Sequence, residues 1–281
     1  MKKQSKVMIG LGAFILIILI LLIAFAPILT PYSPVLDNPA ARLLAPSRAH
    51  IMGTDHFGRD IFTRILYGGR ITLPLAFITI FLTFILGCSL GIVCAFNYKK
   101  FLDNAIMRIV DVLLALPFMV LAMSIAAIAG RGLDKLLFIV VLVWWAPFTR
   151  YTRSLVLAIK DQESILAAKI LGANTFTIIF NEILPQVIFP RCIYLTFEFS
   201  NLILSLSTLS FFGLGAQPPT PEWGSMLSDG RSHFLYSAHV LIWPACFVVA
   251  TVLGLNLLGE GLKDYYYPYE LIPFYEEVSN D

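Results

Sequence analysis

Polar side chains inside long apolar runs are the residues of this sequence best suited to a chemical role. Glu198 lies within such a run, where an ionised side chain is costly and usually serves a function. Asn201 follows three residues later, near the same face of a helix, and Asn256 in a later run is a candidate partner. These groups either line a translocation path or hold neighbouring helices together by hydrogen bonds.

Motifs for covalent catalysis or nucleotide binding are not visible. The sequence contains no Gly-Lys dipeptide, so it has no P-loop lysine, and its 4 histidines form no H-E-x-x-H or His/Cys cluster. Asp55, His56 and Asp60 offer metal-ligand types, but local capping and ion pairing are the simpler interpretation. We therefore expect no enzyme activity, bound cofactor or metal in this chain.

The composition is that of an integral membrane protein. Of the 281 residues, 58% are hydrophobic and only 14% are charged, and the mean hydropathy is +0.81. Soluble domains carry about 25% charged residues. The net charge of +2 is too small to indicate nucleic acid binding, so the expected surroundings are membrane lipid.

Six long apolar runs predict six transmembrane helices in an all-α protein. The fourth run must extend past Arg150 and Arg153, whose long stems can reach the membrane interface. The runs lie at residues 7–27, 71–98, 112–130, 136–153, 187–210 and 232–259. The expected regions are a tail and first span (1–29), an extracytoplasmic segment (30–70), a core domain (71–264) and a cytoplasmic tail (265–281).

The extracytoplasmic segment is rich in proline and ends in a polar stretch. Residues 53–55 are expected to cap an amphipathic helix that lies along the membrane before the second span. Its polar side would carry Arg59, Asp60, Arg64 and Arg70. The tryptophans near predicted span ends fit aromatic belts at the interfaces, and they are Trp144, Trp145, Trp223 and Trp243.

The basic residues indicate the orientation. With both termini in the cytoplasm, 12 Lys and Arg residues lie inside and 8 outside, in agreement with the positive-inside rule. The chain is therefore expected to be a multi-pass protein of the cell membrane.

Residues 161–186 lie between apolar runs but carry too many charges to cross a membrane, so they lie at its surface. Ala167, Ala168 and Gly172 would leave one helical face free of bulk, which would admit a helix of another protein at close range. A second apolar stretch then runs to Leu184 and Pro185, and the proline is expected to end it. The simplest alternative is an interfacial helix pair that only joins two spans.

This pattern, A-A-x-x-x-G followed by an apolar stretch and Leu-Pro, resembles the cytoplasmic coupling loop, or EAA loop, of ABC importer membrane subunits. In that family the loop fits a groove of the ATPase. Two residues depart from the family pattern, because Leu166 replaces the usual Glu and Glu182 the usual His.

Three further stretches are similar to one family, the membrane subunits of dipeptide, oligopeptide and nickel ABC importers, in the second of its two permease types. They are G-T-D-H-F-G-R-D-I-F-T-R-I-L-Y-G-G-R (Gly53 to Arg70), L-S-F-F-G-L-G-A-Q-P-P-T-P-E-W-G-S-M-L (Leu209 to Leu227) and N-L-L-G-E-G-L-K-D (Asn256 to Asp264). The resemblance implies a type I ABC importer fold and a heterodimer with a homologous permease. It also implies two ATPase subunits, which bind ATP and Mg²⁺, and an extracytoplasmic substrate-binding protein.

The expected function is therefore that of a permease subunit of an ATP-driven importer for peptides or nickel and other metal chelates. The alternative is an ion-coupled secondary transporter, which would use membrane carboxylates and usually internal repeats. Only Glu198 is clearly embedded, and no repeat is visible.

Overall fold

The computed structural model describes residues 2–266, apart from the side chains of residues 2, 3 and 189–192. Regular structure in this range is helical, as expected for an all-α protein. The expected tail at 265–281 is described only as far as Tyr266, and the rest lies outside the described residues. The helices are α1 (Lys2–Ala24), α2 (Ala26–Leu29), α3 (Ile61–Phe96), α4 (Phe101–Ala115), α5 (Phe118–Ala129), α6 (Leu133–Ile159), α7 (Glu163–Ile170), α8 (Thr175–Thr177), α9 (Leu184–Phe211), α10 (Trp223–Arg231) and α11 (His239–Tyr266), with a 3-10 turn at Pro39–Ala41 and a π-helical segment at Ile178–Ile183.

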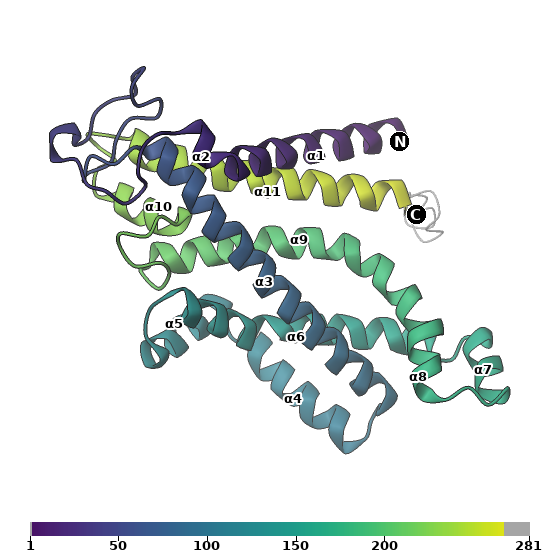
Figure 1. Ribbon diagram of the computed structural model, residues 1–281. Helices are drawn as coiled ribbons and strands as arrows, with labels where there is room; N and C mark the ends of the chain where they lie inside the picture. The colour runs from purple at the N-terminus through teal and green to yellow at the C-terminus, as the bar shows by residue number, and fades with distance from the viewer. Residues whose placement is uncertain (1, 267–281) are drawn as a thin grey trace, which may run out of the picture.

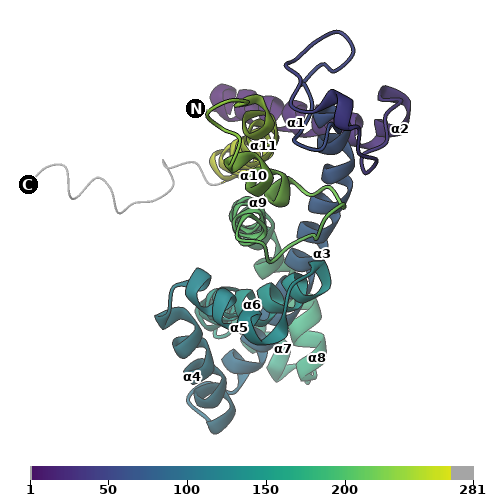
Figure 2. The same ribbon diagram turned by 90° about the vertical axis from the view of Figure 1, so that its left-hand side faces the viewer.

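The long helices form two groups joined by α3. The first and last long helices, α1 and α11, run side by side, with α9 next to α11, whereas α4, α5 and α6 lie together on the other side (Figures 1 and 2). The long helix α3 crosses from the first group to the second. Close approach of α1 and α11 depends on glycine, since a Cβ at Gly12 would lie 2.7 Å from the carbonyl oxygen of Gly254.

Three of the helices, α1, α3 and α11, are long and apolar enough to cross a membrane. The number rises to five if α4 with α5, and the two parts of the bent helix from Thr175 to Phe211, each count as one span. Helix α6 has 27 residues and is long enough, at about 40 Å, but it is not among these candidates. The described residues thus contain three to five of the six expected spans.

Helix α3 differs from the expected amphipathic helix followed by a separate span. It runs without a break for 36 residues from Ile61, so residues 61–70 are its first turns. The capping residue is Asp60, whose Oδ2 accepts a 2.8 Å hydrogen bond from the amide of Thr63, and not residues 53–55. Asp55 is engaged elsewhere, because its Oδ2 accepts a 2.8 Å bond from Nε of Arg59.

The third apolar run is also divided where a single span was expected. Leu116 has extended backbone angles, and Pro117 precedes the first turn of α5, so α4 and α5 meet at 98°. The cause is local, because the residue before a proline is driven out of the helical region.

Trp145 and Trp223 are buried in the core and do not lie in an interfacial belt, so that expectation was wrong for these two residues. The side chain of Trp223 is fully buried, and its Nε1 donates a 2.9 Å hydrogen bond to the carbonyl of Ile65 in α3. The indole therefore fixes α10 against the end of α3 that lies opposite the chain termini (Figure 1).

Candidate functional site

The predicted coupling segment, residues 161–186, lies at the same end of the molecule as both described chain termini. Helices α7 and α8 extend beyond the main helix groups there, whereas α2, α10 and the loop before α3 lie at the opposite end (Figure 1). A tight turn joins this segment to α6, with the amide of Gln162 donating to the carbonyl of Ile159 at 2.9 Å. Glu163 in the first turn of α7 and Lys169 in the last complement the helix dipole.

Gly172 lies just beyond the last turn of α7 and ends the helix. Its φ of +85° is accessible mainly to glycine, and the amide of Ala173 donates to the carbonyl of Ala168 at 3.0 Å. The amide of Gly172 donates to Lys169 at 3.1 Å, which completes a Schellman motif. Asn174 then starts the next turn, because its Oδ1 accepts a 2.8 Å bond from the amide of Thr177.

The three small residues of α7 do not share one open face, so that part of the prediction was wrong. Ala168 is half-buried against the cluster that contains Ile165, whereas Ala167 is exposed. Gly172 lies beyond the last helical residue, and a Cβ there would have no atom within 4 Å. Ile165 is fully buried and anchors α7 to the bundle.

Large apolar side chains cover the free surface of the coupling segment instead. Leu166 is 42% exposed, Ile170 and Leu171 are each 86% exposed, and Phe176 is 74% exposed. We call these four residues the apolar knob. An apolar cluster of this kind beside charged residues marks a surface for another protein or for the membrane.

Pro185 does not end the apolar stretch after α8. It lies in the first turn of α9, and the chain continues as helix to Phe211. A π-helical segment precedes it, in which the amide of Leu184 bonds to the carbonyl of Ile179. The wider π turn accommodates a residue that lacks an amide hydrogen.

Glu198 finds its partner on α6 and not on α11. The indole Nε1 of Trp144 donates a 3.1 Å hydrogen bond to Oε2 of the buried Glu198 side chain. Phe118 packs edge-on against the Trp144 ring at a centroid distance of 4.6 Å. Asn256 is half-buried on α11, and Asn201 is exposed, so the structure does not bring the three predicted polar residues together.

A buried ion pair near the coupling segment was missed in the sequence. Arg153 donates from Nε and a terminal nitrogen to the two oxygens of Asp103, at 2.6 Å and 2.8 Å, and so joins α4 to α6. Lys99, Arg153 and Lys160 also lie within 5.2 Å of the ring centre of Tyr98. The sequence could not predict this ion pair, because its two residues are 50 positions apart and only the fold of α3, α4 and α6 brings them together.

Glu222 is the second residue that the sequence did not single out. Its two oxygens accept 2.9 Å hydrogen bonds from the amides of Gly224 and Ser225, which caps α10, and Thr72 of α3 donates to it at 3.3 Å. Burial raises the pKa of the Glu222 carboxyl, and the hydrogen bonds from Gly224 and Ser225 act in the opposite direction. No clear signal for this cap was present in the sequence, because Glu is not among the residues that usually occupy the N-cap position.

Comparison with known proteins gives a consistent result. Residues 87–269 match the family described as binding-protein-dependent transport system inner membrane component. The dipeptide transport system permease protein DppC of Alkalihalophilus pseudofirmus is 40% identical over 264 residues, which cover 94% of this chain and 86% of that protein. The glutathione transport system permease protein GsiD of Pectobacterium atrosepticum is 39% identical, with coverage of 93% and 86%.

Among solved structures, chains from inward-facing forms of the MetNI methionine ABC transporter share the fold. One of them has a TM-score of 0.57 and 17% sequence identity, and the match covers 70% of this chain and 93% of that chain. At this identity the likeness concerns the fold alone. Residues outside the matched family region include α1 and most of α3.

Proposed function

The chain belongs to the binding-protein-dependent transport system inner membrane components, permease subunits of ABC importers, and from this premise we propose that it imports small peptides in an ATP-driven complex. The observation that carries the substrate class is the alignment of 94% of the chain with a dipeptide permease. A second alignment, with a glutathione permease, supports the same class. Nickel and metal chelates gain no support from these relatives.

The proposed complex contains a homologous permease, two ATPase subunits that bind ATP and Mg²⁺, and a substrate-binding protein outside. In this arrangement the apolar knob docks on the ATPase. Ile170, Leu171 and Phe176 favour this role, because apolar side chains so far exposed are stabilised when a protein partner covers them. Ala167, on the same short helix, would leave room for close contact. Leu184 and Pro185 would carry the movement of the knob into α9.

This role fixes the proposed orientation. The coupling segment and both described termini lie at one end of the molecule (Figure 1), so docking of an ATPase would place both termini in the cytoplasm. The opposite end, with α10 and the loop before α3, would then meet the substrate-binding protein.

The proposed translocation path runs beside α9. Asn201 supports it, because an exposed amide within an apolar helix is costly in lipid and is stabilised by water or by a polar partner. Glu198 lies one turn away, and Asn256 is on the neighbouring helix α11. The second permease would complete the wall that this chain leaves open.

Uptake of a radiolabelled dipeptide into proteoliposomes tests the function. The vesicles would contain the chain with its partner permease and ATPases, with binding protein and dipeptide outside and ATP inside. We expect uptake that depends on ATP, the binding protein and the ATPases. Uptake by the permeases alone under a proton or sodium gradient would favour the secondary transporter instead. ATP-dependent uptake of Ni²⁺ but not of peptides would overturn the substrate class.

A further inference from the structure

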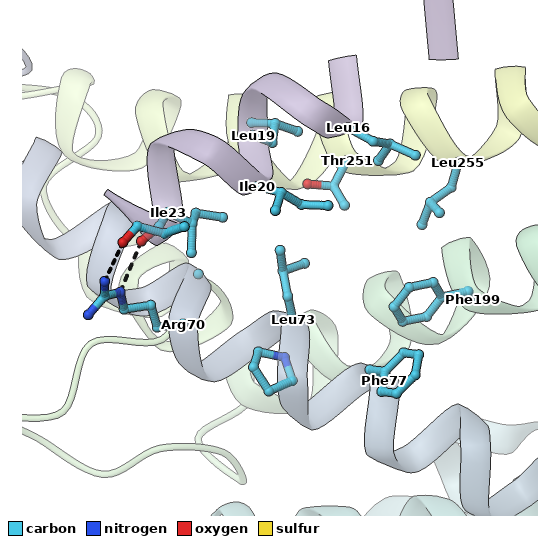
Figure 3. A pocket seen from close by; sticks show the side chains of 13 residues that line it. Leu16, Leu19, Ile20, Ile23, Arg70, Leu73, Phe77, Phe199, Thr251 and Leu255 are labelled. Atoms are coloured by element: carbon cyan, nitrogen blue, oxygen red, sulfur yellow. Dashed lines mark hydrogen bonds between the residues drawn. The ribbon is translucent and has the colours of Figure 1, made fainter. Parts of the chain in front are cut away.

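An apolar crevice of 510 Å³ opens between α1, α3, α9 and α11 (Figure 3). Ile20 and Ile23 of α1 form one wall and Leu73 and Phe77 of α3 the facing wall, with Phe199 and Leu255 at the far end. Apart from Arg70 and Thr251, its lining is apolar. A crevice with so few polar groups does not hold ordered water.

The crevice is somewhat shorter than the hydrocarbon part of one membrane leaflet. On α1 its lining runs from Leu16 to Ala24, which is about 12 Å at 1.5 Å per residue. Half of a hydrocarbon core is about 15 Å. Because α1 is a candidate span and Ala24 is its last residue, the crevice extends from the membrane surface opposite the termini toward the bilayer centre.

A cation lies at the surface end of the crevice. Arg70 donates from Nε to the carbonyl of Ile23 at 2.9 Å and from Nη2 to that of Ala24 at 2.6 Å (Figure 3). Its side chain remains exposed, and Nη1 makes no hydrogen bond to the described residues. The ring of Tyr67 lies 5.4 Å from the guanidinium carbon, and such aromatic residues are enriched at membrane interfaces.

We propose that this crevice binds a phospholipid, with one acyl chain between α1 and α3 and the phosphate on Arg70. The long apolar lining matches the acyl chain of a phospholipid, and the exposed cation at one end matches its phosphate. The residues around the mouth are also those of a lipid-facing surface, with Ile17 55%, Ile20 56% and Phe77 60% exposed. The positive charge of Arg70 and the N–H groups of its Nη1 can bind a phosphate oxygen by a charge-assisted hydrogen bond.

Most of the lining comes from the N-terminal part of the chain. The lining residues of α1 and α3 all precede residue 87, where the match to the transporter family begins, whereas Phe199, Thr251 and Leu255 lie within the matched region. The bound lipid would fill the gap between α1 and α3, which contact each other much less than α1 contacts α11. Its role would be to fix α1 against the core.

Native mass spectrometry of the complete transporter tests the proposal, with a phosphatidylglycerol of known mass titrated into delipidated complex. Leu73→Trp fills the crevice, and Phe14→Trp is the matched control because Phe14 is an exposed residue of α1 outside the lining. We expect Leu73→Trp to lose one tightly bound lipid per copy of this chain and Phe14→Trp to keep it. Equal lipid counts in the wild type and Leu73→Trp would overturn the site.

A second variant tests the phosphate contact without filling the crevice. Arg70→Gln should weaken binding about tenfold, as expected for one charge-assisted hydrogen bond, and Arg70→Lys should restore most of it. Phosphatidylcholine, which has a phosphate but no net charge, should show the same dependence on Arg70. If Ile20→Cys forms a disulfide with a cysteine of the partner permease, a protein and not a lipid occupies the crevice. That result would reject the proposal.

Discussion

Trp144 and Glu198 join α6 to α9 by a 3.1 Å hydrogen bond from the indole Nε1 to a carboxylate oxygen. The sequence left two roles open for Glu198, one in the translocation path and one in helix packing. The bond shows that Glu198 helps to hold α9 against α6, but it uses only one oxygen of the carboxylate. Charge and hydrogen bonding can therefore be tested separately.

Trp144→Phe keeps the packing against Phe118 and removes the donor. We expect the free energy of unfolding to fall by about 1 kcal/mol, the usual net value of one hydrogen bond. Glu198→Gln keeps an acceptor oxygen for Trp144 and removes the charge. If the carboxylate lines the path, this variant retains its thermal stability but loses peptide uptake. Normal uptake by Glu198→Gln would restrict Glu198 to a packing role.

Gly172→Trp should uncouple ATP hydrolysis from uptake. The new side chain would project into open space beside the apolar knob and hold the ATPase away. A loss of about 1.4 kcal/mol in docking free energy corresponds to about tenfold weaker association. ATPase activity and uptake would be measured on the same vesicles.

Gly213 provides the control for this substitution. It also has a left-handed φ, +84° against +85° for Gly172, open space at its Cβ position and a Schellman motif, but it follows α9 at the opposite end. Gly213→Trp therefore introduces similar strain and bulk. Equal loss of coupling in both variants would show that strain, and not docking, is responsible.

Asp103→Asn should lower stability much more than Asp111→Asn. Both aspartates join α4 to arginines of α6, but Asp103 is buried, whereas Asp111 and its partner Arg150 are exposed. Breaking a buried pair costs about 3–5 kcal/mol, and we expect the lower end because the Arg153 side chain is 22% exposed. An exposed pair in water contributes less than about 1 kcal/mol.

Thermal unfolding of the purified complexes measures both effects. The double variant Asp103→Arg with Arg153→Asp should recover part of the loss, since the opposite charges are restored. A large effect of Asp111→Asn would mean that the second pair faces lipid and not water.

Glu222 should make the stability of the α10 region dependent on pH. Its pKa is raised above the ordinary 4.5 by burial, so the folded state favours the protonated acid. The corresponding stability is fully present below pH 4.5 and is lost as the pH rises through the folded pKa. Glu222→Gln should remove this dependence, because the amide oxygen still caps α10 but does not ionise. Amide hydrogen exchange of residues 223–231, measured as a function of pH, would detect this dependence. If Glu222→Gln kept the same pH profile as the wild type, the assignment to Glu222 would be wrong.

The sequence predicted the helical class and the approximate positions of the long helices, because apolar runs act locally. It also indicated Glu198, whose cost in a membrane does not depend on the fold. It failed where helices meet. The buried side of Ala168, the ion pair of Asp103 and the burial of Trp223 all depend on neighbours distant in the sequence.

Two errors had local causes that could be recognised. Pro117 breaks a run that was taken as one span, whereas Pro185 was expected to end a helix that in fact begins there. Whether the helix breaks at the proline depends on the backbone conformation of the residues before it. Leu116 is extended, while a π turn before Pro185 lets the helical path continue.

The packing of α1 on α11 affects how the chain is made. Helix α1 has its main partner more than 200 residues later in the sequence. During synthesis α1 must therefore remain in the bilayer with its glycine face uncovered until α11 has been inserted.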